Sequence, residues 1–187
     1  MPNKLLRTVD SLLVRHFGLR YALLTRDWMI HERMRFLVDR IAHESGPIRV
    51  LDAGCGSGLA LLYLHWYQRS KVSSYLGLDL DTRKLRTRYE FVRIPHTFRD
   101  IDLDSSWHFG QFDLVFCSEV LEHLSEDARL FSRLCCHLSE NGTLLITTPH
   151  KEFVRRKAAK FPLTRSVPSS RVLVLTSAIR PPIRSVI

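Results

Sequence analysis

A glycine-rich segment between two apolar stretches constrains the fold of this chain most strongly. Asp52-Ala53-Gly54-Cys55-Gly56-Ser57-Gly58 follows a short β-type run, Ile48–Asp52, and precedes an apolar, helix-like run, Leu59–Gln68. Alternating glycines let the backbone turn sharply and leave no Cβ between the main chain and a ligand. The amides at the start of the following helix add polar contacts. A strand, a glycine turn and a helix in this order predict a binding loop at the edge of a parallel sheet.

The chain beyond this loop repeats the alternation of strand and helix. Strands that alternate with helices indicate a parallel sheet covered on both faces. We therefore predict an α/β fold, a Rossmann-like three-layer sandwich with a mainly parallel sheet, in which Asn141-Gly142 makes a turn. The expected strands are Ser74–Leu80, Thr97–Ile101, Phe112–Cys117 and Thr143–Thr148, and the expected helices are Leu59–Gln68, Thr82–Tyr89 and Ser125–Leu138.

Three regions follow from these patterns. Residues 1–46 read as a helical segment, with helices expected at 4–16 and 25–43, and residues 47–160 form the binding domain. Residues 161–187 read as a basic, poorly ordered tail that four prolines interrupt. Within this tail, only the apolar run Arg171–Thr176 has the character of a further strand.

The net charge of +9 is concentrated at the carboxyl end, where residues 151–187 contain nine Lys or Arg and one acid. Such a tail does not exclude nucleic acid, but a solvated end is the favoured interpretation. Residues 4–26 carry five basic residues and one acid among apolar ones. They permit peripheral contact with an anionic membrane, although a helix that closes the binding site is the favoured interpretation. The four cysteines form no C-x-x-C pair, which favours reduced thiols and a cytoplasmic location.

A carboxylate follows the next strand in Gly77-Leu78-Asp79, 21 residues after Gly58. At this position Asp79 can accept hydrogen bonds from both hydroxyls of a ribose. The alternative role is a helix cap, for which Asp81, just before Thr82, is better placed.

Three segments, VLDAGCGSG, YLGLDLD and FDLVFCSEVLEHL, resemble class I S-adenosylmethionine-dependent methyltransferases. The resemblance runs from Ile48 to Pro149 and is greatest to the broad group that includes the ubiquinone-biosynthesis O-methyltransferases. It implies binding of S-adenosylmethionine as cofactor. The residues implied to hold the methionine part are Asp52, Gly54, Cys55, Gly56 and Gly58, and Asp79 is implied to hold the ribose. Leu80, Asp100 and Ile101 are implied to contact the adenine. Glu119 and Val120 are implied to lie at the sulfur end.

The resemblance also raises the question of a metal. Ubiquinone-pathway and small-RNA 2′-O-methyltransferases carry a similar E-x-x-E-H pattern as metal ligands. Here Glu119, Glu122 and His123 would share a helix face and could bind a divalent cation such as Mg²⁺. The alternative is that Glu122 and His123 only begin a helix. Glu119 and His123 are also the candidate catalytic residues, with His123 as a general base.

The expected function is methyl transfer to an O, N or C atom of a small-molecule substrate. A dehydrogenase shares the fold, but it uses G-x-G-x-x-G, and position 59 here is leucine. Members of the family end in an antiparallel strand hairpin beside the fifth strand, and this chain lacks the pattern for a complete one. The alternative function is therefore a truncated, catalytically inactive cofactor-binding module. The methyl acceptor and the oligomeric state stay open.

Overall fold

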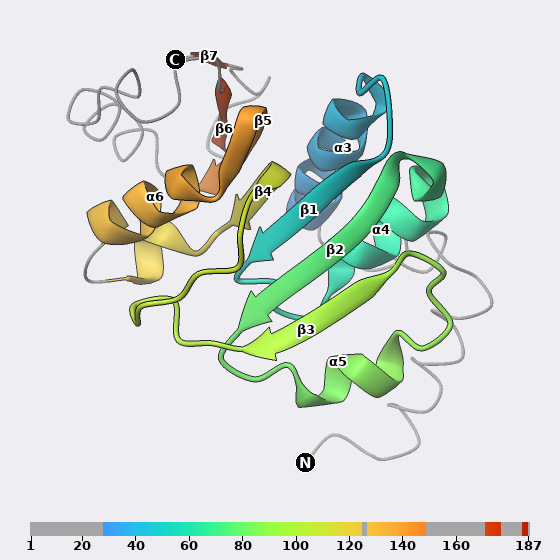
Figure 1. Ribbon diagram of the computed structural model, residues 1–187, viewed down its shortest axis with the longest axis horizontal. Coiled ribbons are helices and arrows are strands. Elements are labelled where there is room, and N and C mark those ends of the chain that lie inside the picture. The colour runs from blue at the N-terminus through green and yellow to red at the C-terminus, as the bar shows by residue number, and fades with distance from the viewer. Residues whose placement is uncertain (1–27, 125–126, 149–170, 177–184, 187) are drawn as a thin grey trace.

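The computed structural model of the chain describes residues 28–124, 127–148, 171–176 and 185–186. One sheet runs through them in the order β3-β2-β1-β4-β5-β6-β7 (Figure 1). Neighbouring strands from β3 to β6 are parallel, and only β7 is antiparallel to its neighbour. The predicted mainly parallel, Rossmann-like sheet is confirmed. The strands are β1 Ile48–Ala53, β2 Val72–Asp79, β3 His96–Asp100, β4 Phe112–Ser118, β5 Leu138–Thr148, β6 Arg171–Thr176 and β7 Ser185–Val186.

Helices cover both faces of this sheet. The helices α3, α4 and α5 lie on one face and α6 lies on the other (Figure 1). Their buried side chains belong to two separate apolar clusters, one on each face of the sheet. The side chains of a strand alternate between faces, so Phe116 of β4 belongs to the first cluster and Val115 to the second. This explains why β4 is apolar along almost its whole length. The helices are α3 Trp28–Ala42, α4 Leu59–Tyr67, α5 Arg83–Arg88 and α6 Asp127–Cys136, and the short 3₁₀ segments are η1 Arg69–Lys71 and η2 Leu121–His123.

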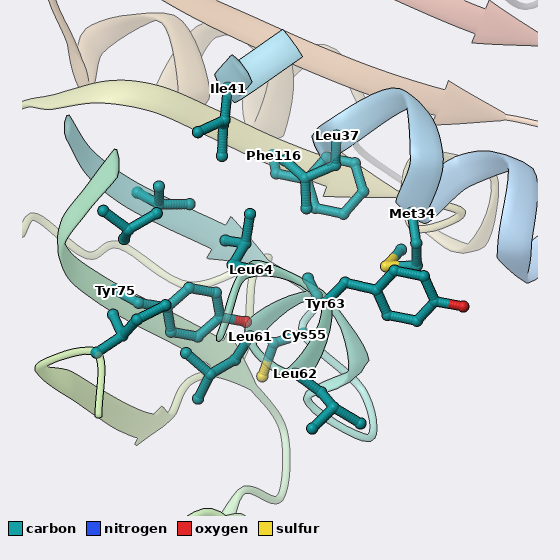
Figure 2. Packing of buried hydrophobic residues seen from close by; sticks show 14 of the residues in the cluster. Met34, Leu37, Ile41, Cys55, Leu61, Leu62, Tyr63, Leu64, Tyr75 and Phe116 are labelled. Atoms are coloured by element: carbon teal, nitrogen blue, oxygen red, sulfur yellow. The ribbon is translucent and has the colours of Figure 1, made fainter. Parts of the chain in front are cut away.

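The helix α3 packs in the same core as the sheet. Leu37 and Ile41 are fully buried there and lie beside Phe116 (Figure 2). At the polar edge of the same face, the Arg40 guanidinium donates to the hydroxyl of Thr143 in β5, with 2.7 Å between the atoms. The expected helix at residues 25–43 is thus present as α3, while the helix expected at 4–16 lies outside the described residues.

The strand β5 begins earlier than the sequence pattern suggests. Asn141-Gly142 does not separate a helix from a strand, because β5 already starts at Leu138. The pairing with β4 shifts between Phe112 and Leu114, and Asn141 has a φ of 64°. The predicted turn is therefore an irregularity inside the strand, in which the chain makes a short detour and then resumes its pairing.

Two pieces of the basic tail join the sheet. The strand β6 pairs with β5 in register from Thr143↔Arg171 to Thr148↔Thr176, and the short β7 pairs with β6. The pairing of β6 with β5 is parallel, whereas the resemblance implied an antiparallel hairpin at this position. A parallel partner needs a crossover of about a dozen residues or more, and the 149–170 interval is long enough for one. The lack of the complete hairpin and the poor order of the tail both stay predictions, because residues 149–170, 177–184 and 187 lie outside the described ranges.

Within the described ranges, no helix combines the length and the apolar character needed to cross a membrane. All four cysteines fall inside these ranges, and each of them is a free thiol.

Candidate active site

The candidate residues meet at the carboxyl edge of the sheet, around the end of β1. This strand pairs with β2 on one side and β4 on the other. The connection after β1 leads to α4 on one face, and the connection after β4 leads to η2 and α6 on the opposite face. In open α/β sheets, ligands bind at such a reversal of strand order.

The loop after β1 depends on its glycines for its shape. Gly54, Gly56 and Gly58 have φ values of 81°, 52° and 76°, in the left-handed region that side chains disfavour. A Cβ at Gly54 would lie 2.2 Å from Val120 Cγ2, and a Cβ at Gly58 would lie 2.5 Å from Tyr89 Cε2. A Cβ at Gly56 would meet nothing within 4 Å. The two outer glycines are thus required by packing, whereas the middle one faces open space.

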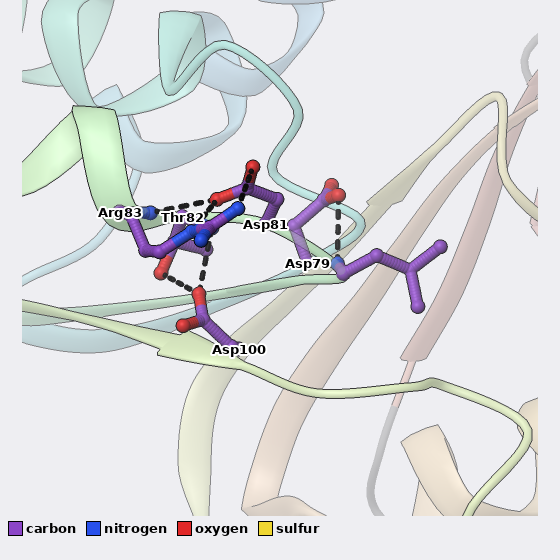
Figure 3. Close-up of polar contacts among 6 residues, drawn as sticks. Asp79, Asp81, Thr82, Arg83 and Asp100 are labelled. Carbon is purple, nitrogen blue, oxygen red and sulfur yellow. Dashed lines mark hydrogen bonds and ion pairs between the residues drawn. The ribbon is translucent and has the colours of Figure 1, made fainter.

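The carboxylate of Asp79 ties this loop to the end of β2. Its Oδ2 accepts a hydrogen bond from the Gly56 amide at 2.7 Å. Its Oδ1 accepts one from the Leu80 amide at 2.8 Å (Figure 3). Leu80 itself is 72% exposed, one of three large apolar side chains exposed in the described part. An ordered carboxylate and an exposed apolar side chain therefore lie next to each other in sequence, close to the uncovered Gly56.

A second pair of acids lies at the same edge (Figure 3). Asp100 Oδ1 accepts hydrogen bonds from the amide and the hydroxyl of Thr82, both at 2.7 Å. The bond from the Thr82 hydroxyl is the main reason that the Asp100 pKa is lowered. Asp81 binds Arg83 at both its oxygens and accepts from its amide, so it stays within its own turn. Asp100 thus stabilises the start of α5 through Oδ1. The Asp100 side chain, which includes Oδ2, is exposed.

Ile101 continues from Asp100 at this edge. Its amide donates to the carbonyl of Asp79 at 2.8 Å, and its side chain is half-buried against the cluster that faces α6. This hydrogen bond joins the end of β3 to the end of β2, and so brings Asp100 and Ile101 close to Asp79 and Leu80, which are distant in the sequence.

Below the loop, Asp52 is buried. Its side chain is 2% exposed, and its Oδ2 accepts a hydrogen bond from the Tyr75 hydroxyl of β2. Burial raises the Asp52 pKa to about 7; the Tyr75 bond opposes this rise and the charge of Asp79 adds to it. Burial, together with Asp52 and Asp79, also raises the pKa of the Cys55 thiol, which packs in the core. Asp52 and Cys55 thus support the loop from beneath.

The turn after β4 holds Glu119 in an unusual conformation. Its φ of 54° is left-handed, which costs a non-glycine residue about 1 kcal/mol or more. The amide of Glu119 donates to the carbonyl of Thr147, and Glu119 Oε1 accepts from the Thr147 hydroxyl at 3.1 Å. Glu119 Oε2 lies 3.4 Å from Arg33 Nη1 of α3. Val120 follows at once and contacts Gly54.

The predicted metal ligands do not come together. No group of three His, Cys, Asp or Glu side chains able to hold a metal occurs among the described residues, which include Glu119, Glu122 and His123. The helix-face argument was wrong because Glu119 precedes the 3₁₀ segment in a left-handed conformation and does not share a helix with the other two. Glu119 faces Arg33 and Thr147, and His123 is exposed. These residues do not fit a divalent cation.

Three residues that the sequence analysis did not single out complete the site. The Tyr89 hydroxyl donates to the Ser57 carbonyl at 2.7 Å and its ring lies against Gly58. Tyr75 binds Asp52, and Arg33 pairs with Glu119. All three lie far along the chain from their partners, and no spacing rule links them to the loop.

Comparison with known proteins agrees with this geometry. A family model described as a methyltransferase domain matches residues 26–173. The ubiquinone biosynthesis O-methyltransferase of Rickettsia prowazekii is 24% identical over 129 residues, which cover 65% of this chain and 49% of that protein. The small RNA 2′-O-methyltransferase of Rattus norvegicus is 32% identical over 142 residues, covering 66% of this chain and 34% of that one. The chain thus spans half or less of these curated relatives.

A solved structure supports the fold. The N-methyltransferase NodS from Bradyrhizobium japonicum, in complex with S-adenosyl-L-homocysteine, superposes with a TM-score of 0.55 at 18% identity. The match covers 72% of this chain and 69% of NodS. The fold and the loop define a class I methyltransferase architecture. The chain belongs to the methyltransferase-domain family of S-adenosylmethionine-dependent enzymes.

Proposed function

We propose that this chain binds S-adenosylmethionine at the carboxyl edge of β1, β2 and β4 and transfers its methyl group to an O, N or C atom of a small molecule. The observation that carries the proposal is the open space at Gly56. Its neighbours in the loop are blocked by Val120 and Tyr89, yet Gly56 is left-handed, uncovered and bonded to Asp79. A loop whose main chain is exposed only at its centre suits a ligand that lies directly on that backbone.

Different residues at this edge are proposed to contact different parts of the cofactor. Asp79 is proposed to hold the ribose, and Leu80, Asp100 and Ile101 the adenine. The loop after β1, with Asp52 and Cys55 beneath it, is proposed to hold the methionine part, with Glu119 and Val120 at the sulfur end. When bound, the cofactor supplies a methyl group on a positively charged sulfur.

The main contribution of the protein itself is proposed to be alignment of the reacting groups. Glu119 is engaged by Arg33 and Thr147, and no metal cluster forms among the described residues. Holding an acceptor in line with the methyl group and excluding water would then be its main catalytic means. His123, exposed at the end of η2, is the remaining candidate for a general base.

A second function is a binding module that does not catalyse. One observation favours it: the candidate catalytic residue Glu119 is already paired with Arg33 and Thr147. The relatives are named for ubiquinone biosynthesis and for small RNA, so they leave the acceptor class open. The free thiols support a cytoplasmic location, which imaging of the tagged chain would test.

Calorimetric titration with S-adenosyl-L-homocysteine tests cofactor binding, and Gly56→Val is the informative variant. Its side chain would fill the ligand's space, so binding should be lost. Gly110→Val is the matched control, because Gly110 has a φ of 81° and open space around it. It lies two residues before β4, at the opposite edge of the sheet. Both variants bear the backbone strain of a side chain at positive φ.

Normal affinity in Gly56→Val, or equal loss in both variants, would contradict the loop assignment. An assay of S-adenosylhomocysteine formation with a panel of small hydroxyl, amine and carboxylate acceptors then separates the two functions. Product formation supports the enzyme, and binding without product supports the module.

A further inference from the structure

The turn after β4 is strained, and one residue of a neighbouring strand contacts both its backbone and its side chain. Glu119 is one of two non-glycine residues with positive φ in the described ranges. Such a conformation persists only where surrounding contacts fix it. Thr147 supplies two of these contacts, because its carbonyl accepts from the Glu119 amide at 3.0 Å and its hydroxyl reaches Glu119 Oε1 at 3.1 Å.

The direction of the hydroxyl hydrogen bonds can be derived. The Oγ of Ser118 and the Oγ1 of Thr147 are 2.8 Å apart, and either could donate. An ionised carboxylate only accepts, so Thr147 must donate its single hydroxyl hydrogen to Glu119. Ser118 must therefore donate to Thr147. The result is a chain of donors in one direction, Ser118 to Thr147 to Glu119, in which each bond polarises the next.

This series of hydrogen bonds is buried and lies close to the candidate site. Thr147 is 1% exposed, and Arg33 of α3 lies on the other oxygen of Glu119. The conformation of Glu119 sets the path of the next residue, Val120, which contacts Gly54 so closely that a Cβ there would lie 2.2 Å from it. A change at Glu119 would therefore reach the glycine loop through Val120.

We propose that Thr147 is a positioning residue for the cofactor site: through its carbonyl and its hydroxyl it fixes Glu119 in the left-handed conformation that places Val120 against the glycine loop. This role rests on the proposed function for its effect on binding. Thr147 acts on the glycine loop through Glu119, which it contacts, and through Val120, which contacts Gly54.

The test compares three variants by calorimetric titration with S-adenosyl-L-homocysteine. Thr147→Val keeps the shape but removes the hydroxyl, and Thr147→Ser restores it. Thr143→Val is the matched control, since Thr143 is also fully buried on β5 and its hydroxyl also has a charged side-chain partner, because it accepts from Arg40 of α3. We expect Thr147→Val to weaken binding about tenfold or more, the scale of a hydrogen bond to a charged group. Thr147→Ser and Thr143→Val should stay close to the unaltered protein.

Hydrogen exchange in the ligand-free protein gives a readout that does not depend on the cofactor. The peptide containing residues 118–124 should exchange faster in Thr147→Val and at the normal rate in the other two variants. Normal exchange in Thr147→Val would overturn the proposal, as would equal loss of affinity in Thr147→Val and Thr143→Val. If the unaltered protein binds no S-adenosyl-L-homocysteine, the proposed function fails, and the exchange rates alone decide the role of Thr147.

Discussion

The buried carboxyl group of Asp52 makes the stability of this protein depend on pH in a specific direction. Its pKa is raised by burial from 3.8 to about 7 in the folded protein. The folded state therefore holds the proton more tightly than the unfolded state. Between about pH 4 and pH 7 the folded state loses stability as pH rises, and above pH 7 the full cost of a buried charge is present.

The size of this effect follows from the shift. Raising the Asp52 pKa from 3.8 to about 7 corresponds to about 4 kcal/mol, because each pKa unit is worth about 1.36 kcal/mol. Asp52→Asn keeps an acceptor for the Tyr75 hydroxyl and cannot ionise. We expect the stability of the variant relative to the unaltered protein to increase by a few kcal/mol between pH 4 and pH 8. Any constant penalty for the new amide group cancels in this comparison.

The assay is urea unfolding of both proteins, without cofactor, at several pH values. Asp113→Asn is a control of opposite sign. Partial burial would raise the Asp113 pKa, but hydrogen bonds from Arg49 lower it to about 2. Losing that carboxylate should therefore cost stability at pH 7 and progressively less as pH falls toward 2. A difference between Asp52→Asn and the unaltered protein that stays constant from pH 4 to pH 8 would refute the reasoning.

Three further predictions concern the loop and its surroundings. Asp79→Ala should weaken binding of S-adenosyl-L-homocysteine about tenfold or more. Asp81→Ala, which removes contacts to Arg83, should have little effect, and equal calorimetric affinities of the two variants would contradict the ribose assignment. Gly58→Ala should lower the free energy of unfolding by about 1–3 kcal/mol, because a Cβ meets Tyr89 at 2.5 Å and φ is 76°; unchanged urea unfolding would argue against that packing. Addition of Mg²⁺ should leave the melting temperature unchanged in the unaltered protein and in His123→Ala. A rise in the melting temperature of the unaltered protein that is absent in His123→Ala would instead support the metal site.

Much of the fold could be predicted from local pattern. The glycine loop and the apolar runs at β1 and β4 have signatures that depend only on neighbouring residues, and both strands occur where expected. The irregular start of β5 could not be predicted, because Asn-Gly favours a turn locally and its incorporation in the strand depends on pairing with β4. The parallel direction of β6 relative to β5 could not be predicted either, because an apolar run carries no information on the orientation of its partner strand.

In the candidate site, too, residues with a local sequence signature could be predicted, and contacts between distant residues could not. Asp79 and the three glycines were predicted from their positions after strands; the structure gives the glycines positive φ values and joins Gly56 to Asp79, and their roles toward a cofactor stay predictions. The supporting contacts of Tyr75 with Asp52 and of Arg33 with Glu119 join distant parts of the chain. The metal prediction failed for a related reason. The spacing of Glu119 and His123 suggests one helix face only if the backbone is helical throughout, and the left-handed φ of Glu119 breaks that condition.

The strand order also has a consequence for how the chain folds. Strands β1, β2 and β3 follow one another closely in sequence, but β1 joins β4 by pairing Val50 with Leu114, 64 residues away. Contacts of such separation form late, because the intervening chain must first lose much of its freedom. The candidate site lies on this junction. A ligand there would contact both halves of the sheet, so its binding would select chains in which the late step is complete and would slow their unfolding.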